Sequence, residues 1–536
     1  MNGKKILSNK IFLYVTEFFA GASVMAIELG AQRLLSPYFS SSQIVWTIVI
    51  GTIMIAMALG NIYGGRKADK DPNPDKLYSR LLISATWIAL IPLLGKYVIA
   101  GISAVLIFAV NSGFLIVAAT VSCLVLFVFP LFLLGTTSPC LVKYCTKSLD
   151  ESGKIVGNLN AFNTIGSIIG TFLPTFVTIP TVGTNMTFLI FALVLISISL
   201  VYFISEKKFL FKMAVAVLAL IVGTVFGHTS HFAFWEDNNV YEGESTYNYL
   251  KVYETNSTVG LSTNVLFGVQ SVKFKNKGVH TGYYYDYDLG AYYMTNGTKK
   301  EKVKVLILGM GSGTYASQLR EFYNNVDITG VEIDEKITKL SREYFSLSDE
   351  VTVYTYDGRA FLNVTKEKYD IIMVDAYQDI TIPFQMSSIE FFEGVKSHLT
   401  ADGVMAVNLN MRSDEPNNIN YYLCDTISKV FSSVYTFDVG STTNRELFAF
   451  ESETALNDLK ENLETEENGV LRNFIKTRVL SALKKYEAGN LILTDDKAPV
   501  ELLGISVIDG LIIGEAEYYR TIFKEKGIKG LLEELG

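Results

Sequence analysis

The pattern of apolar positions divides the chain into two unlike parts. Residues 11 to 228 hold apolar runs of about twenty residues, such as 44–63, 114–134 and 188–204, and later residues alternate short apolar and polar segments. A helix of about twenty apolar residues can cross the hydrocarbon layer of a membrane. The pattern therefore predicts an all-α transmembrane bundle over residues 1–232 and a globular part after it.

The apolar runs predict seven membrane spans, and a further apolar segment at 97–110 either lies along the interface or extends the third span. The spans are expected near 11–35, 43–64, 79–96, 113–135, 155–179, 184–204 and 209–228. We therefore expect a multi-pass protein of the cell membrane, with the lipid bilayer as one of its partners.

Basic residues cluster in alternate loops of the bundle. They lie at the N-terminus and in the loops that contain Arg66, Lys67, Lys70 and Lys76, then Lys143, Lys147 and Lys154, then Lys207, Lys208 and Lys212. By the positive-inside rule the N-terminus is cytoplasmic, so seven spans place the globular part outside. Nucleoside substrates are made in the cytosol, which favours the opposite side, and the sequence leaves this conflict open.

The first span carries the charged residues Glu17, Glu28 and Arg33. Glu17 and Glu28 are close to three helical turns apart and share one face, which is consistent with a stripe that lines a path for cations. The alternative is that Glu17 and Arg33 extend to the two interfaces and Glu28 pairs with another helix. The asparagines 158, 160 and 163 of the fifth span favour hydrogen bonds between helices.

The sequence pattern of the globular part predicts a small β-region, then a larger α/β domain, and then a C-terminal tail. Short β-like pieces occupy 233–300, and regularly spaced strands separated by helix-length segments fill 301–515. The strands are expected at 303–309, 327–333, 351–356, 369–375, 403–409, 433–439 and 445–451. This order predicts a mainly parallel, three-layer Rossmann-like domain of the class I methyltransferase type, and residues 516–536 predict a helical tail.

A glycine turn after the first of these strands is the strongest functional signal. Gly309, Gly311 and Gly313 remove side chains where the backbone turns sharply near a ligand, with Ser312 or the next residues opening a helix. Glu332 ends the second strand about twenty residues later, at the separation where a carboxylate reaches ribose hydroxyls. The spacing G-x-G-x-G and the absence of a P-loop lysine favour a nucleoside without a long phosphate chain.

Two further strand ends carry acids. Asp357, followed by Gly358, ends the third strand, and Asp375 ends the fourth. Ligands of such sheets lie outside the carboxyl ends of the strands, so one acid could accept from an adenine amino group and the other could face the reacting centre. The alternative is that both acids only cap helices.

Composition limits the other possibilities. The hydrophobic share of 49% and mean hydropathy of +0.28 are high for a soluble protein. The formal charge of −8 argues against a nucleic-acid partner, which would require a basic face. The four histidines are isolated and the four cysteines form no framework, so we expect neither a metal site nor disulfides.

Taken together, these residues resemble the spermidine synthases, in particular the membrane-fused spermidine-synthase-like proteins. The resemblance is carried in the bundle by AGASVMAIELGAQRLLSPYFSSSQIVW and MALGNIYGGRKAD. In the globular part it is carried by ESTYNYLKV, ILGMGSG, VEIDEKI, YDGRAFL, YDIIMVDAYQD, ITIPFQM and LTDDKAPVE. It covers nearly the whole chain.

The resemblance implies transfer of an aminopropyl group from decarboxylated S-adenosylmethionine to a small polyamine, leaving methylthioadenosine. It implies that Asn248, Glu332, Asp357 and Gly358 bind the donor and that Asp375 is the catalytic acid residue. Acceptor-binding roles fall to Tyr285, Asp286 and Asp288, and to Tyr377 and Gln378 of the fourth-strand loop.

Two positions depart from the family pattern. Ser312 and Gln378 stand where the family has aspartates that bind amines and repel the carboxylate of intact S-adenosylmethionine. An enzyme that uses intact S-adenosylmethionine, as a methyltransferase or a lyase, is therefore one alternative. A polyamine transporter or sensor with a ligand-binding α/β domain is another, because the bundle is larger than an anchor requires. A homo-oligomer also stays open.

Overall fold

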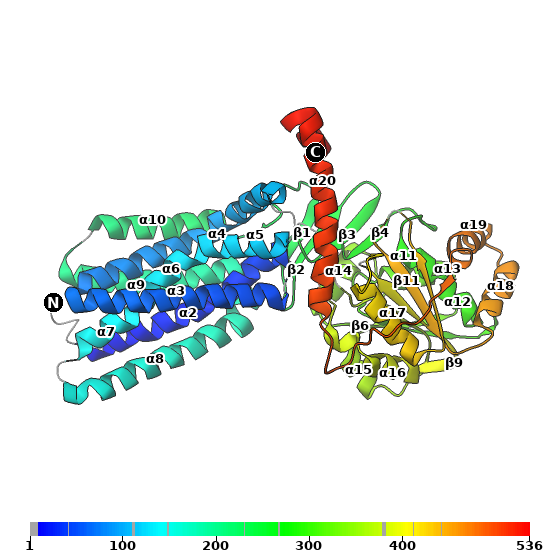
Figure 1. Cartoon of the computed structure of the whole chain (residues 1–536), viewed down its shortest axis with the longest axis horizontal. Helices are drawn as coiled ribbons and strands as arrows, with labels where there is room; N and C mark the ends of the chain where they lie inside the picture. The colour runs from blue at the N-terminus through cyan, green and yellow to red at the C-terminus, as the bar shows by residue number, and fades with distance from the viewer. Residues whose placement is uncertain are drawn as a thin grey trace.

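The computed structural model describes residues 9–535 except 41, 110–112, 147–148, 209, 230, 266–268, 378–381, 411 and 441. It consists of a long helical bundle, a small antiparallel sheet and a larger α/β domain (Figure 1). The N-terminal end of the bundle and the α/β domain lie at opposite ends of the molecule (Figure 1).

The bundle contains α2 (Lys10–Phe39), α3 (Gln43–Lys70), α4 (Pro74–Ala109), α5 (Phe114–Cys123), α6 (Phe129–Gly135), α7 (Thr137–Cys145), α8 (Ser152–Leu173), α9 (Ile179–Glu206) and α10 (Leu210–Gly227). Wider helical turns join α5 to α6 over Leu124–Val128 and follow α8 over Pro174–Thr178. At Gly183 the backbone leaves the helical conformation with φ 85°, and the chain reverses there into the main part of α9 (Figure 1).

Five helical stretches of the described chain are long and apolar enough to cross a membrane. They are Lys10–Phe39, Gln43–Lys70, Pro74–Leu106, Phe114–Cys145 and Ser152–Glu206. The last of them is 55 residues long and contains two of the spans that the sequence predicts, and the predicted seventh span is the shorter apolar helix Phe211–Gly227. The apolar segment at 97–110 is expected either along the interface or as an extension of the third span. It extends the third span, because α4 continues to Ala109.

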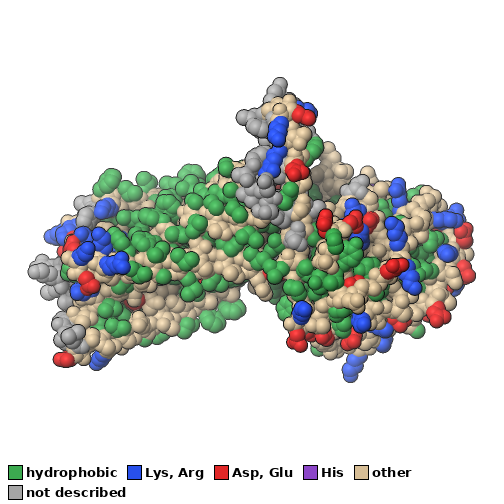
Figure 2. Space-filling view, viewed as in Figure 1, with side chains coloured by type: hydrophobic (Ala, Val, Ile, Leu, Met, Phe, Trp, Pro, Cys, Tyr) green, Lys and Arg blue, Asp and Glu red, His purple; other side chains and the backbone are tan. Residues whose placement is uncertain are grey.

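The surface of the bundle is strongly apolar between its two ends (Figure 2). Side chains such as Met54, Ile55, Phe172 and Phe176 are between 59% and 68% exposed, although they are large and hydrophobic. Basic side chains gather instead at the end away from the α/β domain (Figure 2). An apolar belt with a charged end is the surface that a lipid bilayer accommodates.

A four-stranded antiparallel sheet follows the bundle, in the order β1-β2-β3-β4. Its strands are β1 (Asn239–Glu244), β2 (Tyr249–Glu254), β3 (Thr258–Ser262) and β4 (Ser271–Phe274). Two short helices, α11 (Tyr284–Asp288) and α12 (Gly290–Met294), then lead into the larger domain.

The larger domain is built on an eight-stranded sheet in the order β12-β10-β11-β9-β8-β5-β6-β7. The strands are β5 (Val303–Leu308), β6 (Val326–Glu332), β7 (Thr352–Thr355), β8 (Tyr369–Val374), β9 (Leu399–Leu409), β10 (Ser433–Asp438), β11 (Arg445–Phe450) and β12 (Lys484–Lys485). The run from β7 to β9 is parallel, whereas β11, β10 and β12 are antiparallel to their neighbours. The Rossmann-like prediction is confirmed, with an antiparallel edge added.

Helices cover both faces of this sheet. They are α13 (Thr314–Phe322), α14 (Glu335–Tyr344), α15 (Gly358–Val364), α16 (Ile389–Ser397), α17 (Ile419–Val430), α18 (Ala455–Thr465) and α19 (Gly469–Phe474). Alternate residues of one strand belong to different cores: Leu306 and Leu308 to one, Val305 and Ile307 to the other. Because successive side chains of a strand point to opposite faces, this alternation shows that the sheet is the middle of three layers.

The final helix, α20, runs from Val500 to Leu535 and stands across the end of the bundle, beside the α/β domain (Figure 1). It contacts α4, α5 and α17. Its second residue, Glu501, accepts a hydrogen bond at 2.8 Å from the backbone N–H of Gln43, the first residue of α3. The helical tail expected at 516–536 is therefore part of a longer helix that begins in the preceding domain. The other domain boundaries stay predictions.

Candidate active site

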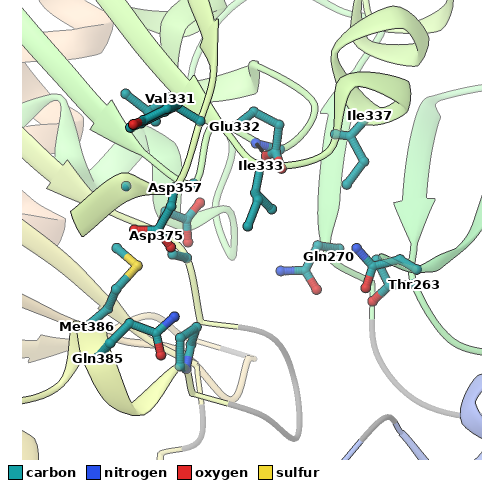
Figure 3. Close-up of a pocket in the computed structure, with 17 residues that line it drawn as sticks. Thr263, Gln270, Val331, Glu332, Ile333, Ile337, Asp357, Asp375, Gln385 and Met386 are labelled. Atoms are coloured by element: carbon teal, nitrogen blue, oxygen red, sulfur yellow. Dashed lines mark hydrogen bonds between the residues drawn. The ribbon is translucent and has the colours of Figure 1, made fainter. Parts of the chain in front are cut away.

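A pocket of about 140 Å³ opens at the carboxyl edge of the parallel strands. Glu332, Asp357 and Asp375 reach it from the ends of β6, β7 and β8 (Figure 3). Thr263, which follows β3, and Gln270, which precedes β4, face them (Figure 3). The topology of a parallel sheet therefore gathers three acids, distant in sequence, around one cavity.

The glycine turn forms one wall of this pocket. Gly309 has φ 81°, and a β-carbon added to it would lie 2.6 Å from the Cα of Ala376. Gly309 and Gly311 line the cavity, whereas Gly313 is the N-terminal cap of α13, which begins one residue later. Only glycine allows the turn after β5 to pass this close to the end of β8.

Ser312 is buried at 1% exposure and does not line the pocket. Its hydroxyl lies 2.6 Å from the hydroxyl of Thr314, the first residue of α13. The serine hydroxyl therefore contacts the first residue of α13 rather than the pocket.

Glu332 is held in place by the backbone. Its Oε2 accepts a hydrogen bond from the N–H of Gly311 at 2.9 Å, and its Oε1 accepts one from the N–H of Asp334 at 3.0 Å. Burial raises the pKa of this carboxyl, and these backbone bonds oppose the change because they stabilise the charged form. Each oxygen keeps a lone pair that a ligand hydroxyl could use.

Asp357 caps a helix and also lies in the pocket. Its Oδ1 accepts from the N–H of Ala360 at 2.8 Å and caps α15, and the residue lines the pocket together with Gly358. The two interpretations are therefore compatible, because capping uses one carboxylate oxygen and leaves the other.

Three side chains donate hydrogen bonds to Asp375. Asn408 donates to its Oδ1 at 3.0 Å, and the hydroxyls of Tyr284 and Tyr285 donate to its Oδ2 at 3.0 and 3.1 Å. Burial raises the pKa of Asp375 to about 7, although the three donors favour its charged form and oppose this rise. A carboxylate with a pKa near neutrality can accept and release a proton at physiological pH.

A pair of buried acids, Asp288 and Glu446, lies near Asp375. Asp288 and Glu446 are both at 0% exposure, and their carboxyl groups face each other. None of their four oxygens accepts a hydrogen bond from another described group. Burial raises both pKa values well above the usual range, so the two carboxyls share at least one proton.

The residues that are predicted to bind the amine acceptor lie in different surroundings. Tyr285 donates to Asp375, whereas Asp286 is fully buried and its Oδ2 accepts a hydrogen bond at 2.5 Å from the backbone N–H of His280. Asp286 and Asp288 are not among the residues that line the described pocket. Tyr377 is also buried, and its hydroxyl donates to the carbonyl of Met386 at 3.0 Å. Gln378 lies outside the described residues.

Asn248 lines the pocket from the turn between β1 and β2. The hydroxyl of Ser245, in the same turn, donates to Asp334. The other oxygen of Asp334 caps α14 by accepting from the backbone N–H of Lys336 at 3.1 Å. The turn is thus fixed to the chain that follows Glu332.

Sequence reasoning missed several residues of the site. Tyr284 and Asn408 hold Asp375, and Gln270, Gln385 and Met386 line the pocket. Asn408 follows the same rule as the predicted acids, since it stands near the carboxyl end of β9. No group of three or more His, Cys, Asp or Glu side chains that could hold a metal occurs among the described residues.

A Rossmann-like sheet with an acid-lined pocket at the glycine turn defines a class of nucleoside-binding domains. The spermine/spermidine synthase domain matches residues 292–446. A probable polyamine aminopropyl transferase of Bifidobacterium longum (strain NCC 2705) is 48% identical over 349 residues, which are 62% of this chain and 77% of that protein. The chain belongs to the family of polyamine aminopropyltransferases, and it is therefore a transferase.

Other similarities are shorter or more distant. A polyamine aminopropyltransferase of Vibrio vulnificus (strain CMCP6) is 29% identical over 141 residues, which are 25% of this chain and 46% of that protein. A probable spermidine synthase of Corynebacterium glutamicum has a solved structure with a TM-score of 0.36 and 18% identity, covering 47% of this chain and 96% of that one.

Proposed function

We propose that the protein is a membrane-bound aminopropyltransferase that uses decarboxylated S-adenosylmethionine and a diamine such as putrescine, and releases spermidine and methylthioadenosine. The observation that carries the proposal is Asp375, a carboxylate with a pKa of about 7 beside Glu332 and Asp357 in one pocket. Family membership supports the reaction type. The apolar belt of the bundle supports membrane attachment.

The donor would bind along the strand ends. Glu332 would accept hydrogen bonds from the ribose hydroxyls, and Asp357 with Gly358 would contact the adenine. The glycine turn would approach the nucleoside closely, and Asn248 would close the site from the β1–β2 turn. The three acids suit a cationic sulfonium donor and oppose a donor that carries a carboxylate of its own.

Asp375 would act as the general base. The acceptor enters as an ammonium ion, whose nitrogen cannot attack until it loses a proton, and Asp375 accepts that proton. The neutral amine then attacks the aminopropyl carbon next to the sulfonium. A C–N bond forms while the C–S bond breaks, and the bonding electrons pass to sulfur, giving neutral methylthioadenosine and a secondary ammonium product. Tyr284 and Tyr285 hold the carboxylate at the reacting centre.

The test is a product assay by mass spectrometry on the purified full-length protein with putrescine and either donor. We expect methylthioadenosine and spermidine from decarboxylated S-adenosylmethionine only. Asp375→Asn should lower turnover by about 10²- to 10⁴-fold. Asp402→Asn, a change at an exposed acid of the same domain, is the matched control.

Two results would reject the proposal. One is a folded protein that forms neither product, and the other is turnover of intact S-adenosylmethionine in place of the decarboxylated donor. The second result would support the alternative that Ser312 and Gln378 leave open.

A further inference from the structure

The bundle contains a polar cavity of about 320 Å³. It lies between α2, α3, α8, the end of α6 and the start of α7. Amide and hydroxyl groups of its wall come from Asn61, Thr137, Ser138, Asn160, Asn163 and Ser167. The residues of α2 that line it, Ala20 to Val24, are about 15–20 Å from the start of that helix at Lys10, by the rise of 1.5 Å per residue. The cavity is separate from the pocket of the α/β domain, because the two share no lining residue.

Glu17 lies next to this cavity, because its carboxyl contacts Asn163 and Ser138, which are two of the lining residues. Its side chain is at 0% exposure, so it is enclosed by the bundle and does not extend to a membrane interface. Asn163 donates to its Oε1 at 2.8 Å, and Ser138 lies beside the same carboxyl. Oε2 accepts no hydrogen bond from a described residue. The hydroxyl of Thr137 also has no hydrogen-bond partner among the described residues.

Small residues build this arrangement into the packing of α2 against α8. A β-carbon added to Gly21 would lie 2.5 Å from the carbonyl oxygen of Asn163. One added to Gly166 or Gly170 would lie 2.0 or 2.1 Å from carbonyl oxygens of α2. The two backbones are thus in direct contact, as glycines allow in membrane helices, and this contact sets Asn163 against Glu17.

A buried carboxyl oxygen without a donor in an apolar bundle is costly unless a ligand, water or proton satisfies it. A primary ammonium group supplies one positive charge and three N–H donors, and it needs only acceptors around it. The oxygens of Glu17, Thr137, Ser138 and the asparagines are such acceptors. One carboxylate with neutral oxygens matches a single ammonium better than it matches a divalent metal ion.

We infer that this cavity binds an ammonium-bearing ligand, with Glu17 as the counter-ion and the amide and hydroxyl groups as acceptors. The choice of a free polyamine as the ligand rests on the proposed function. An ethanolamine lipid headgroup carries the same ammonium chemistry, and the experiment separates the two sources.

The probe is a spermidine derivative with an aryl azide on one terminal nitrogen, photolysed with the full-length protein in nanodiscs of phosphatidylcholine. Mass spectrometry then maps the labelled peptides. We expect label on α2, α7 or α8 that excess spermidine removes and that Glu17→Gln lowers at least tenfold. Glu28→Gln, which changes another glutamate of the same helix, should leave the bundle label unchanged.

Two further variants test whether the label depends on this cavity. Asn61→Ala alters the cavity wall on α3 without touching Glu17, and should lower the bundle label several-fold in a protein that still folds. Asp375→Asn should retain the bundle label. Persistent label in Glu17→Gln, or competition by phosphatidylethanolamine or sodium ions but not by spermidine, would overturn a polyamine site here.

The product assay is run on the same preparations. A protein that makes no spermidine but shows Glu17-dependent label contradicts the proposed function and leaves the bundle site standing. A protein that makes spermidine but shows no such label contradicts only the bundle site.

Discussion

The guanidinium of Arg33, in the first helix of the bundle, donates to the carbonyl oxygen of Ser245 at 3.3 Å. A second guanidinium nitrogen binds the carbonyl of Thr246. Ser245 in turn donates to Asp334, two residues after Glu332. A bundle side chain is therefore connected, through one turn, to the strand end where we propose that the ribose binds.

Arg33→Gln should weaken nucleoside binding, because the turn that carries Ser245 and Asn248 loses its charged anchor. A charged hydrogen bond contributes about 1.5–3 kcal/mol, and part of that would appear as a several-fold loss of affinity for methylthioadenosine. Calorimetry on the full-length protein measures it. Arg66→Gln, at an exposed arginine near the end of α3, is the control. Equal affinities in the two variants would show that the contact has no bearing on the site.

The rate of product formation should rise with pH through about pH 7. Asp375 must be deprotonated to accept the amine proton, and its pKa lies near 7. Tyr284→Phe removes a hydrogen bond to the charged form, so the midpoint should move upward by roughly one pH unit. The pH profile of kcat/KM measures this shift. Tyr356→Phe alters a pocket tyrosine with no bond to Asp375 and should keep the midpoint in place.

Glu446→Gln should make the α/β domain less sensitive to alkaline pH. The pKa values of Asp288 and Glu446 are raised in the folded state, so above about pH 4.5 the folded protein holds protons that the unfolded chain has lost. The free energy of unfolding then falls as pH rises, by about 1.4 kcal/mol per pH unit for each such proton. The amide removes one of these groups and can donate to Asp288.

Thermal labelling of the buried thiol of Cys424, followed by mass spectrometry at pH 6 and pH 8, measures the effect. The difference between the two melting temperatures should shrink in Glu446→Gln. It should not change in Glu453→Gln, an exposed acid of the same domain. A wild-type protein that is equally stable at both pH values would contradict the shared proton.

The basic end of the bundle and the α/β domain should be accessible from opposite sides of the membrane. Lys70→Cys lies at the basic end and Lys366→Cys in the α/β domain, and both positions are exposed. The basic end should be cytoplasmic, so an impermeant maleimide applied to intact cells should label Lys366→Cys and leave Lys70→Cys unlabelled until lysis. Labelling of both from one side would show that the bundle does not separate them.

Periodicity and turn chemistry were sufficient for the order of elements. The seven strands expected between 303 and 451 correspond to β5–β11, with boundaries within a few residues, because each is a short apolar run bounded by turn residues. The direction of β10 and β11 could not be derived in this way. An apolar strand has the same pattern whether its neighbour is parallel or antiparallel, and the pairing depends on how the chain returns to the sheet.

The positions of the site acids could be predicted from the sequence, but their hydrogen-bond and charge partners could not. By itself the sequence determined that Glu332, Asp357 and Asp375 stand at the carboxyl ends of strands, because local spacing fixes where each strand ends. Only the tertiary structure decided that Asp288 faces Glu446 near Asp375, that Tyr284 holds Asp375, and that Asn163 reaches Glu17. Those partners lie 91 to 158 residues apart in the chain, and only the packing of sheet and helices brings them together.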